Sequence, residues 1–465
     1  MGREMLIALT VAVVVAVIVA SIMHALPLPG RGAETSRPED PADGELVFVD
    51  VAQEIGLDFR HGAFRWEVTD DPSSLLGSGV CWIDFDRDGW MDLFAVNNWT
   101  ESEWSRWQDE GGVPTSRLYR NERGSFVDVT VETGTGLDFH GQGCVAADFD
   151  SDGYSDLYVA STGGDALLWN VAGGRFRQGG EDAGVASDAW STGVSAGDVN
   201  GDGLIDLFVA DHDDTPRLFL NLGDRRFAEA AAELGIDTYR GGSLVDVDAD
   251  GDLDLVELGS DATTTVFVNE PADSALGVRF VEASDQAPPE VGADGASWGD
   301  FDLDGVWDRF DVSGDLASVA PASPVFRSGA GLGDRAADVG LDDLSIAGRS
   351  SAIADYDNDG DLDVAVGTVG GQLVLLSNRG AGGHWMGVDT SRLPPGTSVE
   401  VTLPDGITVT RRVVAGSSYL SSEDPRALFG LGTAARVEAV VVRSPDGTEW
   451  IYRGLRTNRY LAPDS

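Results

Sequence analysis

The chain has no lysine, and all 31 of its basic residues are arginines. Because 79 residues are acidic, the formal net charge is −48 at pH 7. A surface this acidic repels nucleic acid and anionic lipid, so neither is expected as a partner. The acidity has two readings: part of it is ligand carboxylate that a metal would neutralise, and the rest is an adaptation to a salty or acidic medium.

Cysteine is almost absent, since only Cys81 and Cys144 occur. Two cysteines cannot make a zinc site or a disulfide framework. Each lies just before an aspartate-rich loop, three residues ahead in one case and four in the other. This offset of one residue places them on opposite faces of equivalent strands. We therefore expect buried free thiols rather than a disulfide.

The motifs of common enzymes are also missing. There is no phosphate-binding G-x-x-x-x-G-K-[ST] sequence and no G-x-S-x-G nucleophile elbow. Paired carboxylates are frequent, but the motif described below assigns them to metal. We expect no enzyme activity, with a hydrolase or lyase on the same scaffold as a remote alternative.

Only one long apolar run exists, at residues 5–23, and it is interrupted by Thr10 and Ser21. Such a run is just long enough to cross a hydrocarbon core of about 30 Å. No good A-x-A-like cleavage site follows it. We predict an uncleaved signal-anchor within residues 1–26, with a cleaved signal peptide as the alternative, and a flexible tether over 27–45. The expected location is extracytoplasmic, periplasmic or at the cell surface, or secreted if the segment is cleaved.

What the chain does have is a repeat, together with 60 glycines that favour tight turns and all-β structure. The copies begin 48 to 64 residues apart, about the length of a four-stranded propeller blade. They are DFDRDGWMD from Asp84, DFDSDGYSD from Asp148, DVNGDGLID from Asp198, DVDADGDLD from Asp246, DFDLDGVWD from Asp300 and DYDNDGDLD from Asp355.

Each copy is flanked by short apolar runs that read as antiparallel strands. The third run of each unit ends in a polar residue, at Asn121, Asn170, Asn221, Asn269, Ser328 and Asn378. A fourth run begins with phenylalanine in most units. Residues 48–51 resemble such a fourth run but precede the first unit, so we predict that they complete the last blade and close the ring. The predicted fold is an all-β propeller over residues 46–379 with six blades, or seven with a degenerate one, followed by a small β domain over 380–465.

The repeated loop has the chemistry of a calcium site. Carboxylate or amide oxygens fall at positions 1, 3, 5 and 9 and a backbone carbonyl at position 7, while glycine at position 6 permits the sharp turn. The EF-hand alternative fails because position 12 is not glutamate in five copies and the flanks read as strands. The predicted ligands of up to six calcium ions are Asp84, Asp86, Asp88, Trp90 and Asp92; Asp148, Asp150, Asp152, Tyr154 and Asp156; Asp198, Asn200, Asp202, Leu204 and Asp206; Asp246, Asp248, Asp250, Asp252 and Asp254; Asp300, Asp302, Asp304, Val306 and Asp308; and Asp355, Asp357, Asp359, Asp361 and Asp363. The third site is expected to be weaker because Asn200 replaces a carboxylate.

These loops resemble the FG-GAP/VCBS repeats of integrin-α-type propellers. The segment GSSYLSSEDPRALFGLG from Gly416 resembles the ASPIC/UnbV domain, and the pairing resembles the cartilage acidic protein family. The family's N-R-x-G-I-G-A stretch is absent, and Ser444 stands where tryptophan is usual. The resemblance implies a calcium-dependent extracellular adhesion or interaction role without an established reaction.

A ligand is expected on the face opposite the calcium loops, where aromatic and histidine residues gather in the connecting loops. The alternative is that these residues cap the ring or seal the tail domain against it. The partner would be a protein, or a glycan if the chain is a calcium-stabilised lectin. The candidate residues are His61, Trp66, Trp99, Trp104, Trp107, His140, Trp190 and Tyr239.

Overall fold

The computed structural model describes residues 46–62, 77–99, 104–109, 111–212, 215–236, 241–248, 250–258, 264–283, 296–312, 322–328, 333–380, 382–412 and 420–463. The predicted signal-anchor and tether lie outside these residues, as do Trp66 and Tyr239. Within the described part, no helix is long and apolar enough to cross a membrane.

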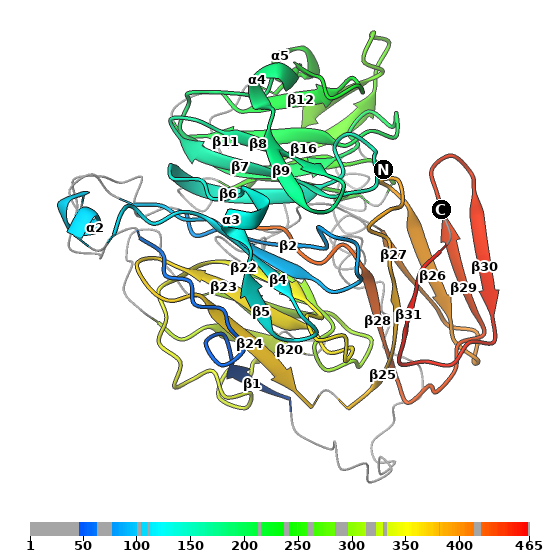
Figure 1. Ribbon diagram of the computed structural model, residues 1–465. Coiled ribbons are helices and arrows are strands. Elements are labelled where there is room, and N and C mark those ends of the chain that lie inside the picture. Colours follow the sequence, from blue (N-terminus) through cyan, green and yellow to red (C-terminus); the bar gives the residue numbers. More distant parts are fainter. Residues whose placement is uncertain are drawn as a thin grey trace, which may run out of the picture.

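Six four-stranded antiparallel sheets, which we number blades 1 to 6, occupy most of the chain (Figure 1). Blade 1 contains β2 (Val80–Ile83), β3 (Asp92–Ala95), β4 (Arg117–Asn121) and β5 (Phe126–Asp128). Blade 2 contains β6 (His140–Ala147), β7 (Asp156–Thr162), β8 (Ala166–Val171) and β9 (Arg175–Gln178). Blade 3 contains β10 (Ser191–Gly197), β11 (Asp206–Asp211), β12 (Arg217–Asn221) and β13 (Phe227–Glu229).

The second half of the chain repeats the pattern. Blade 4 contains β14 (Gly241–Val245), β15 (Asp254–Leu258), β16 (Thr264–Pro271) and β17 (Val278–Glu282). Blade 5 contains β18 (Ala296–Gly299), β19 (Asp308–Asp311), β20 (Val325–Ser328) and β21 (Gly333–Asp334). Blade 6 contains β22 (Gly348–Ala354), β23 (Asp363–Thr368) and β24 (Val374–Arg379), together with β1 (Val47–Asp50) from the other end. The all-β, propeller-like fold is confirmed, whereas the number of blades in the complete ring stays a prediction.

Helices are few and short in the described residues: α2 (Trp104–Asp109), α3 (Thr130–Thr133), α4 (Gly180–Ala183) and α5 (Ala231–Leu234). The last three follow the fourth strands of blades 1 to 3, and each ends at a glycine with positive φ, as at Gly134 (φ 77°). A glycine there ends the helix without steric cost and turns the chain toward the next blade.

After its first aspartate, the second strand is largely apolar in blades 1, 2, 3 and 6, where it is covered on both faces, whereas Asp308–Asp311 in blade 5 alternates buried and half-buried residues. All of Asp92–Ala95 and Asp206–Asp211 are buried, for example. Neighbouring blades pack face to face, and five apolar clusters each join two successive sheets: blades 1 and 2, 2 and 3, 3 and 4, 5 and 6, and 6 and 1. The core therefore lies between the blades rather than within any one of them.

The predicted closure by the N-terminal strand is confirmed. β1 pairs antiparallel with β24, with Phe48 opposite Asn378. The Phe48 ring is 4% exposed and packs edge-on against Phe301, Phe310 and Phe326 at centroid distances of 5.6–6.1 Å. Residues at the two ends of the propeller segment thus share one sheet and one apolar cluster.

The prediction of free thiols was wrong, because Cys81 and Cys144 form a disulfide with their Cα atoms 6.2 Å apart. Both side chains lie in the apolar cluster between blades 1 and 2. A blade presents one face to the preceding blade and the other to the following blade, so neighbours meet through opposite faces of equivalent strands. The one-residue offset that we took as evidence against a disulfide is what brings the two thiols together.

The C-terminal domain follows β24 and forms two sheets, drawn from orange to red in Figure 1. One contains β25 (His384–Val388), β28 (Ala427–Gly432) and β31 (Tyr460–Leu461), and the other contains β26 (Ser398–Thr402), β27 (Thr408–Arg412), β29 (Ala439–Arg443) and β30 (Glu449–Arg453). Their facing sides enclose a separate apolar core.

A segment of this domain, residues 420–424, runs along the first strands of three blades. The amide of Cys144 in β6 donates to the carbonyl of Leu420 (3.0 Å), and the amide of Trp82 in β2 donates to the carbonyl of Ser422 (2.9 Å). The amide of Asp424 donates to the carbonyl of Ile353 in β22 (2.9 Å). The C-terminal domain is therefore hydrogen-bonded to blades 1, 2 and 6 and is not a detached module.

Closure by β1 predicts a large effect of Phe48→Ala. Removing this buried ring leaves a cavity among three phenylalanines, and we expect the free energy of unfolding to fall by about 3–5 kcal/mol. Urea denaturation followed by tryptophan fluorescence measures it. The control is Val49→Ala in the same strand, whose side chain is 44% exposed and should cost less than about 0.5 kcal/mol. Equal losses in the two variants would contradict closure through Phe48.

Candidate metal centres

Every aspartate loop connects the first and second strands of its blade, as predicted. Loop 1 leaves β2 after Ile83 and enters β3 at Asp92, and loops 2 to 6 have the same placement, so the position-9 aspartate always opens the second strand. The flanking elements are strands in all six copies, which agrees with the rejection of an EF-hand.

The loops fold around their own carboxylates. In loop 1, the two carboxylate oxygens of Asp84 accept the amides of Asp88 and Gly89, both at 3.1 Å. Asp88 in turn accepts the amide of Trp90 at 2.9 Å. Gly89 has φ 84°, which explains glycine at position 6. Loops 2 and 6 repeat the bonds to the position-1 aspartate. The chain is thereby wrapped so that its carboxylates converge.

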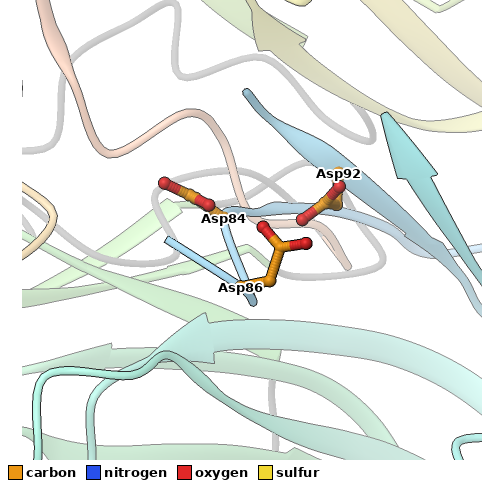
Figure 2. A group of neighbouring side chains, drawn as sticks. All are labelled: Asp84, Asp86 and Asp92. Carbon is orange, nitrogen blue, oxygen red and sulfur yellow. The ribbon is translucent and has the colours of Figure 1, made fainter. Parts of the chain in front are cut away.

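Five of the six loops bring at least three carboxylates together, with one oxygen of each within 4.8 Å of the others. Figure 2 shows the first cluster, in which Asp86 and Asp92 point toward one another beside Asp84. The other clusters are Asp148, Asp150 and Asp156; Asp246, Asp248 and Asp250; Asp300, Asp302 and Asp304; and Asp355, Asp357 and Asp359. Among the described residues, the third loop gives no such cluster of acids, and the prediction that its site binds calcium more weakly stays a prediction.

Several of these carboxylates have a buried oxygen that no protein group satisfies. They are Asp86 Oδ1, Asp246 Oδ1, Asp252 Oδ1, Asp300 Oδ1 and Asp357 Oδ1. A buried carboxylate oxygen without a partner is costly, and a hard cation bound between such oxygens removes that cost. The donor set contains only oxygen, so it suits calcium better than a transition metal.

The position-9 aspartates are the most deeply buried members. In each, one oxygen accepts the amide of loop position 2, as from Phe85 to Asp92 at 3.1 Å. Burial raises the pKa of Asp156 to about 9 and that of Asp206 to about 8, although backbone hydrogen bonds oppose the shift. Burial also raises the pKa of Asp84 and of Asp148 to about 6. Without a cation, these groups resist carrying their charge.

In five of the described blades, the asparagine near the end of the third strand joins neighbouring blades, a role that we did not predict. The backbone amide of Asn170 donates to Asp156 in its own blade (2.7 Å), while its side-chain nitrogen donates to the carbonyl of Phe85 in loop 1 (2.9 Å). We call this arrangement the asparagine clamp. It recurs at Asn121, Asn221, Asn269 and Asn378, each reaching the loop of the preceding blade.

The predicted ligand-binding residues are less exposed than expected. His61, Trp99 and Trp107 are 2%, 8% and 9% exposed. Trp99 is held by His140, which packs on its ring at a centroid distance of 4.5 Å and bonds its carbonyl through Nδ1 at 2.7 Å. Burial lowers the pKa of His61 to about 3. These side chains act largely in packing.

Of the remaining candidates, Trp190 is half-buried and stacks on His212, with ring centroids 4.0 Å apart and planes at 8°. His212 was not among the predicted residues. Trp104 is the first residue of helix α2. The alternative was that these aromatic residues seal the C-terminal domain against the ring, but the described part of that domain lies elsewhere. It instead contacts the aspartate-loop side of blades 5 and 6, as in the bonds from the amide of Gly432 to the carbonyl of Leu303 (3.1 Å) and from Tyr460 to Asp355 (2.7 Å).

The fold and loops define a propeller-like repeat protein with carboxylate clusters on one side and a C-terminal β domain. Comparison with protein families agrees with this class: FG-GAP-like repeats match residues 84–159, 148–209 and 198–257, and the ASPIC and UnbV family matches residues 387–462. The chain therefore carries FG-GAP-like repeats followed by an ASPIC/UnbV domain.

Two full-length relatives are similar to most of the chain. Cartilage acidic protein 1 from Mus musculus and from Homo sapiens is 25% identical over 434 residues, covering 84% of this chain. The match spans 64% of the mouse protein and 63% of the human protein, so less than two thirds of either. A solved Agrocybe aegerita lectin that recognises non-reducing terminal N-acetylglucosamine is 14% identical, covers 66% of this chain and 81% of its own, and has a TM-score of 0.35. That likeness is too low to support an argument about function.

The raised pKa values predict that metal uptake releases protons. Aspartates with a pKa of about 6 to 9 carry protons near neutral pH in the metal-free protein, and a cation must displace them. We therefore expect apparent calcium affinity to rise from pH 6 to pH 8.5, with more protons released per ion at the lower pH. Titration calorimetry in two buffers of different ionisation enthalpy measures both quantities. A pH-independent affinity without proton release would contradict this prediction.

Proposed function

We propose that this chain is a calcium-stabilised, extracytoplasmic β-propeller that acts as an adhesion or protein-interaction module and not as an enzyme. The observation that carries the proposal is the recurrence, in one loop after another, of converging carboxylates with buried oxygens that lack a protein partner. Such oxygens are the preferred ligands of calcium, and their repetition makes bound ions part of the structure.

Location outside the cytoplasm has three supports. The predicted signal-anchor would direct the chain across a membrane. The disulfide between Cys81 and Cys144 is typical of oxidising compartments. Calcium is also abundant outside cells, so the loops would stay loaded there without a high affinity.

A binding role is supported by the repeats themselves and by the similarity to cartilage acidic protein 1. One open hollow lies beside loop 1, where it is lined by Asp86 and Asp88 and by Arg120 and Arg123. The C-terminal domain covers part of the loop side, which leaves the opposite side for a partner. Surface available there includes the half-buried Trp190.

Calcium dependence is testable by counting and by melting. We expect elemental analysis to find up to six calcium ions per chain, and excess chelator to lower the melting temperature by at least about 10 °C, because the ions bind only the folded state. Asp86→Ala should remove one ion, whereas Asp182→Ala, an exposed acid in α4, should remove none. A melting temperature unmoved by chelator would sink the proposal.

A glycan ligand is the second candidate, favoured by the flat stack of Trp190 on His212, since sugars bind well to aromatic faces.

The protein-binding proposal and the glycan alternative predict different results. For a protein partner, we expect the full chain to retain one surface protein in calcium and to release it in chelator, and to bind no sugar on a glycan array. Trp190→Ala should weaken retention at least about tenfold, as for a central aromatic contact, whereas Ile451→Ala in the C-terminal domain should not. Calcium-dependent retention on the array, lost in Trp190→Ala, would instead establish the lectin reading.

A further inference from the structure

Among the described residues, five junctions between successive blades are closed in the same way. An asparagine of the later blade donates its side-chain nitrogen to the carbonyl of loop position 2 in the earlier blade, at 2.7–2.9 Å. The same five junctions contain the five apolar clusters. Each clamp ties a loop, and whatever ion it holds, to the next sheet.

The junction between blades 4 and 5 differs in both respects. Blade 5 has Ser328 where the other blades have asparagine, and this hydroxyl hydrogen-bonds to Asp308 of its own blade. Among the described residues, no clamp reaches the carbonyl of Val247 in loop 4, and no apolar cluster joins these two blades. The residues between them at 284–295 are not described.

The C-terminal domain meets the propeller at this junction. Arg412, at the end of β27, forms an ion pair with the position-1 aspartate of loop 4, Asp246, at 3.3 Å. The same guanidinium lies over the turn of that loop, because a Cβ on Gly251 would be 2.6 Å from its Nη1.

Its neighbour Arg411 reaches loop 5. The Arg411 guanidinium lies 4.6 Å from the centre of the Trp307 ring, at position 8 of that loop. It also interacts with the position-1 aspartate of loop 5: burial raises the pKa of Asp300 well above its usual value, and the charge of Arg411 opposes that shift. Two adjacent arginines therefore contact two successive loops.

We propose that the C-terminal domain is the clasp of the junction between blades 4 and 5, where Arg411 and Arg412 take over the bridging role of the missing asparagine. The C-terminal domain can hold these two arginines in place because other residues of the domain contact loop 6 of blade 6. Tyr460 donates to Asp355 in loop 6 at 2.7 Å, and Arg426 donates to the carbonyl of Asp355 and to Asn358 at 2.7 and 2.6 Å. At blade 5 itself, the backbone of Gly430 is so close to Asp300 that a Cβ would lie 1.9 Å from Oδ2.

The clasp holds blades 4 and 5 together whatever the partner and however many ions are bound. The C-terminal domain thereby completes the propeller at this junction. The strand β27 presents its arginines to the one junction where the repeat departs from its own pattern.

Hydrogen exchange read by mass spectrometry tests the clasp in the full chain at a fixed calcium concentration. In the double variant Arg411→Met, Arg412→Met, amides of β14–β15 and β18–β19 should exchange roughly three- to thirtyfold faster, as expected from loss of the cation–π contacts of Arg411 with Trp307 and Phe429 and of the ion pair between Arg412 and Asp246. Peptides from β6–β8 should be unchanged and serve as the internal reference. The matched control is Arg443→Met, which removes an arginine that pairs with Glu400 and Glu449 inside the C-terminal domain.

A second substitution tests the equivalence directly. Ser328→Asn supplies the missing clamp, so it should slow exchange in blades 4 and 5 and should largely restore protection in the double arginine variant. Unchanged exchange in blades 4 and 5 after loss of both arginines would overturn the proposal, as would an equal acceleration in blades 2 and 3. Failure of Ser328→Asn to restore protection would show that the arginines do not stand in for an asparagine, and the proposal would fall on that ground as well.

Discussion

A buried carboxylate at the start of every second strand is the interaction on which this structure depends. In blade 2, Asp156 accepts the amide of Phe149 through one oxygen and the amide of Asn170 through the other. The first bond shapes the metal loop, the second fixes the third strand, and the side chain of Asn170 continues to the loop of blade 1. Loop, sheet and ring are therefore one hydrogen-bonded unit. Since the charge at its centre is costly in a buried position, cations in the loops would act on the whole ring rather than on single turns.

This arrangement also divides the molecule into two sides. The loops, the clamps and the C-terminal domain share one side, where Arg412 pairs with Asp246 and Arg426 pairs with Asp424 while donating to the carbonyl of Asp355. With no lysine in the chain, every such contact is made by a guanidinium, which binds carboxylates in a fixed planar geometry. The aromatic residues near Trp190 lie in the loops at the other ends of the strands. The proposed metal sites and the proposed partner surface therefore lie on different sides of the propeller.

The repeat made much of this predictable from sequence, and its limits follow from the same cause. Phe48 could be assigned to blade 6 because the fourth strand has a recognisable start, and Asn200 marked the third loop as different. The asparagines were visible as a polar end to each third strand, but their bonds cross from one blade to another and so leave no local pattern. The disulfide was not predicted for a similar reason. Strand alternation gives the face of the sheet on which Cys81 lies, whereas the bond depends on how two sheets meet. The contacts between the C-terminal domain and the propeller do not repeat along the sequence, so the repeat gave no way to predict them.

The placement of the only two cysteines gains a physical explanation from that docking. Gly79 lies two residues before Cys81, and Gly143 lies directly before Cys144. Leu420 approaches both glycines where a side chain would stand. A Cβ on Gly79 would lie 2.4 Å from the carbonyl oxygen of Leu420, and a Cβ on Gly143 would lie 2.9 Å from the Cα of Leu420. At the same place the amide of Gly79 donates to the carbonyl of Gln142 (3.1 Å), and a Cβ on Gly79 would lie 2.8 Å from the Cα of Gly143, so the two strands approach each other closely. The disulfide joins the same two strands one to two residues further along. Because the bridge lies beside the contacts of Leu420, it constrains the strands that bind the C-terminal domain as well as the junction of blades 1 and 2.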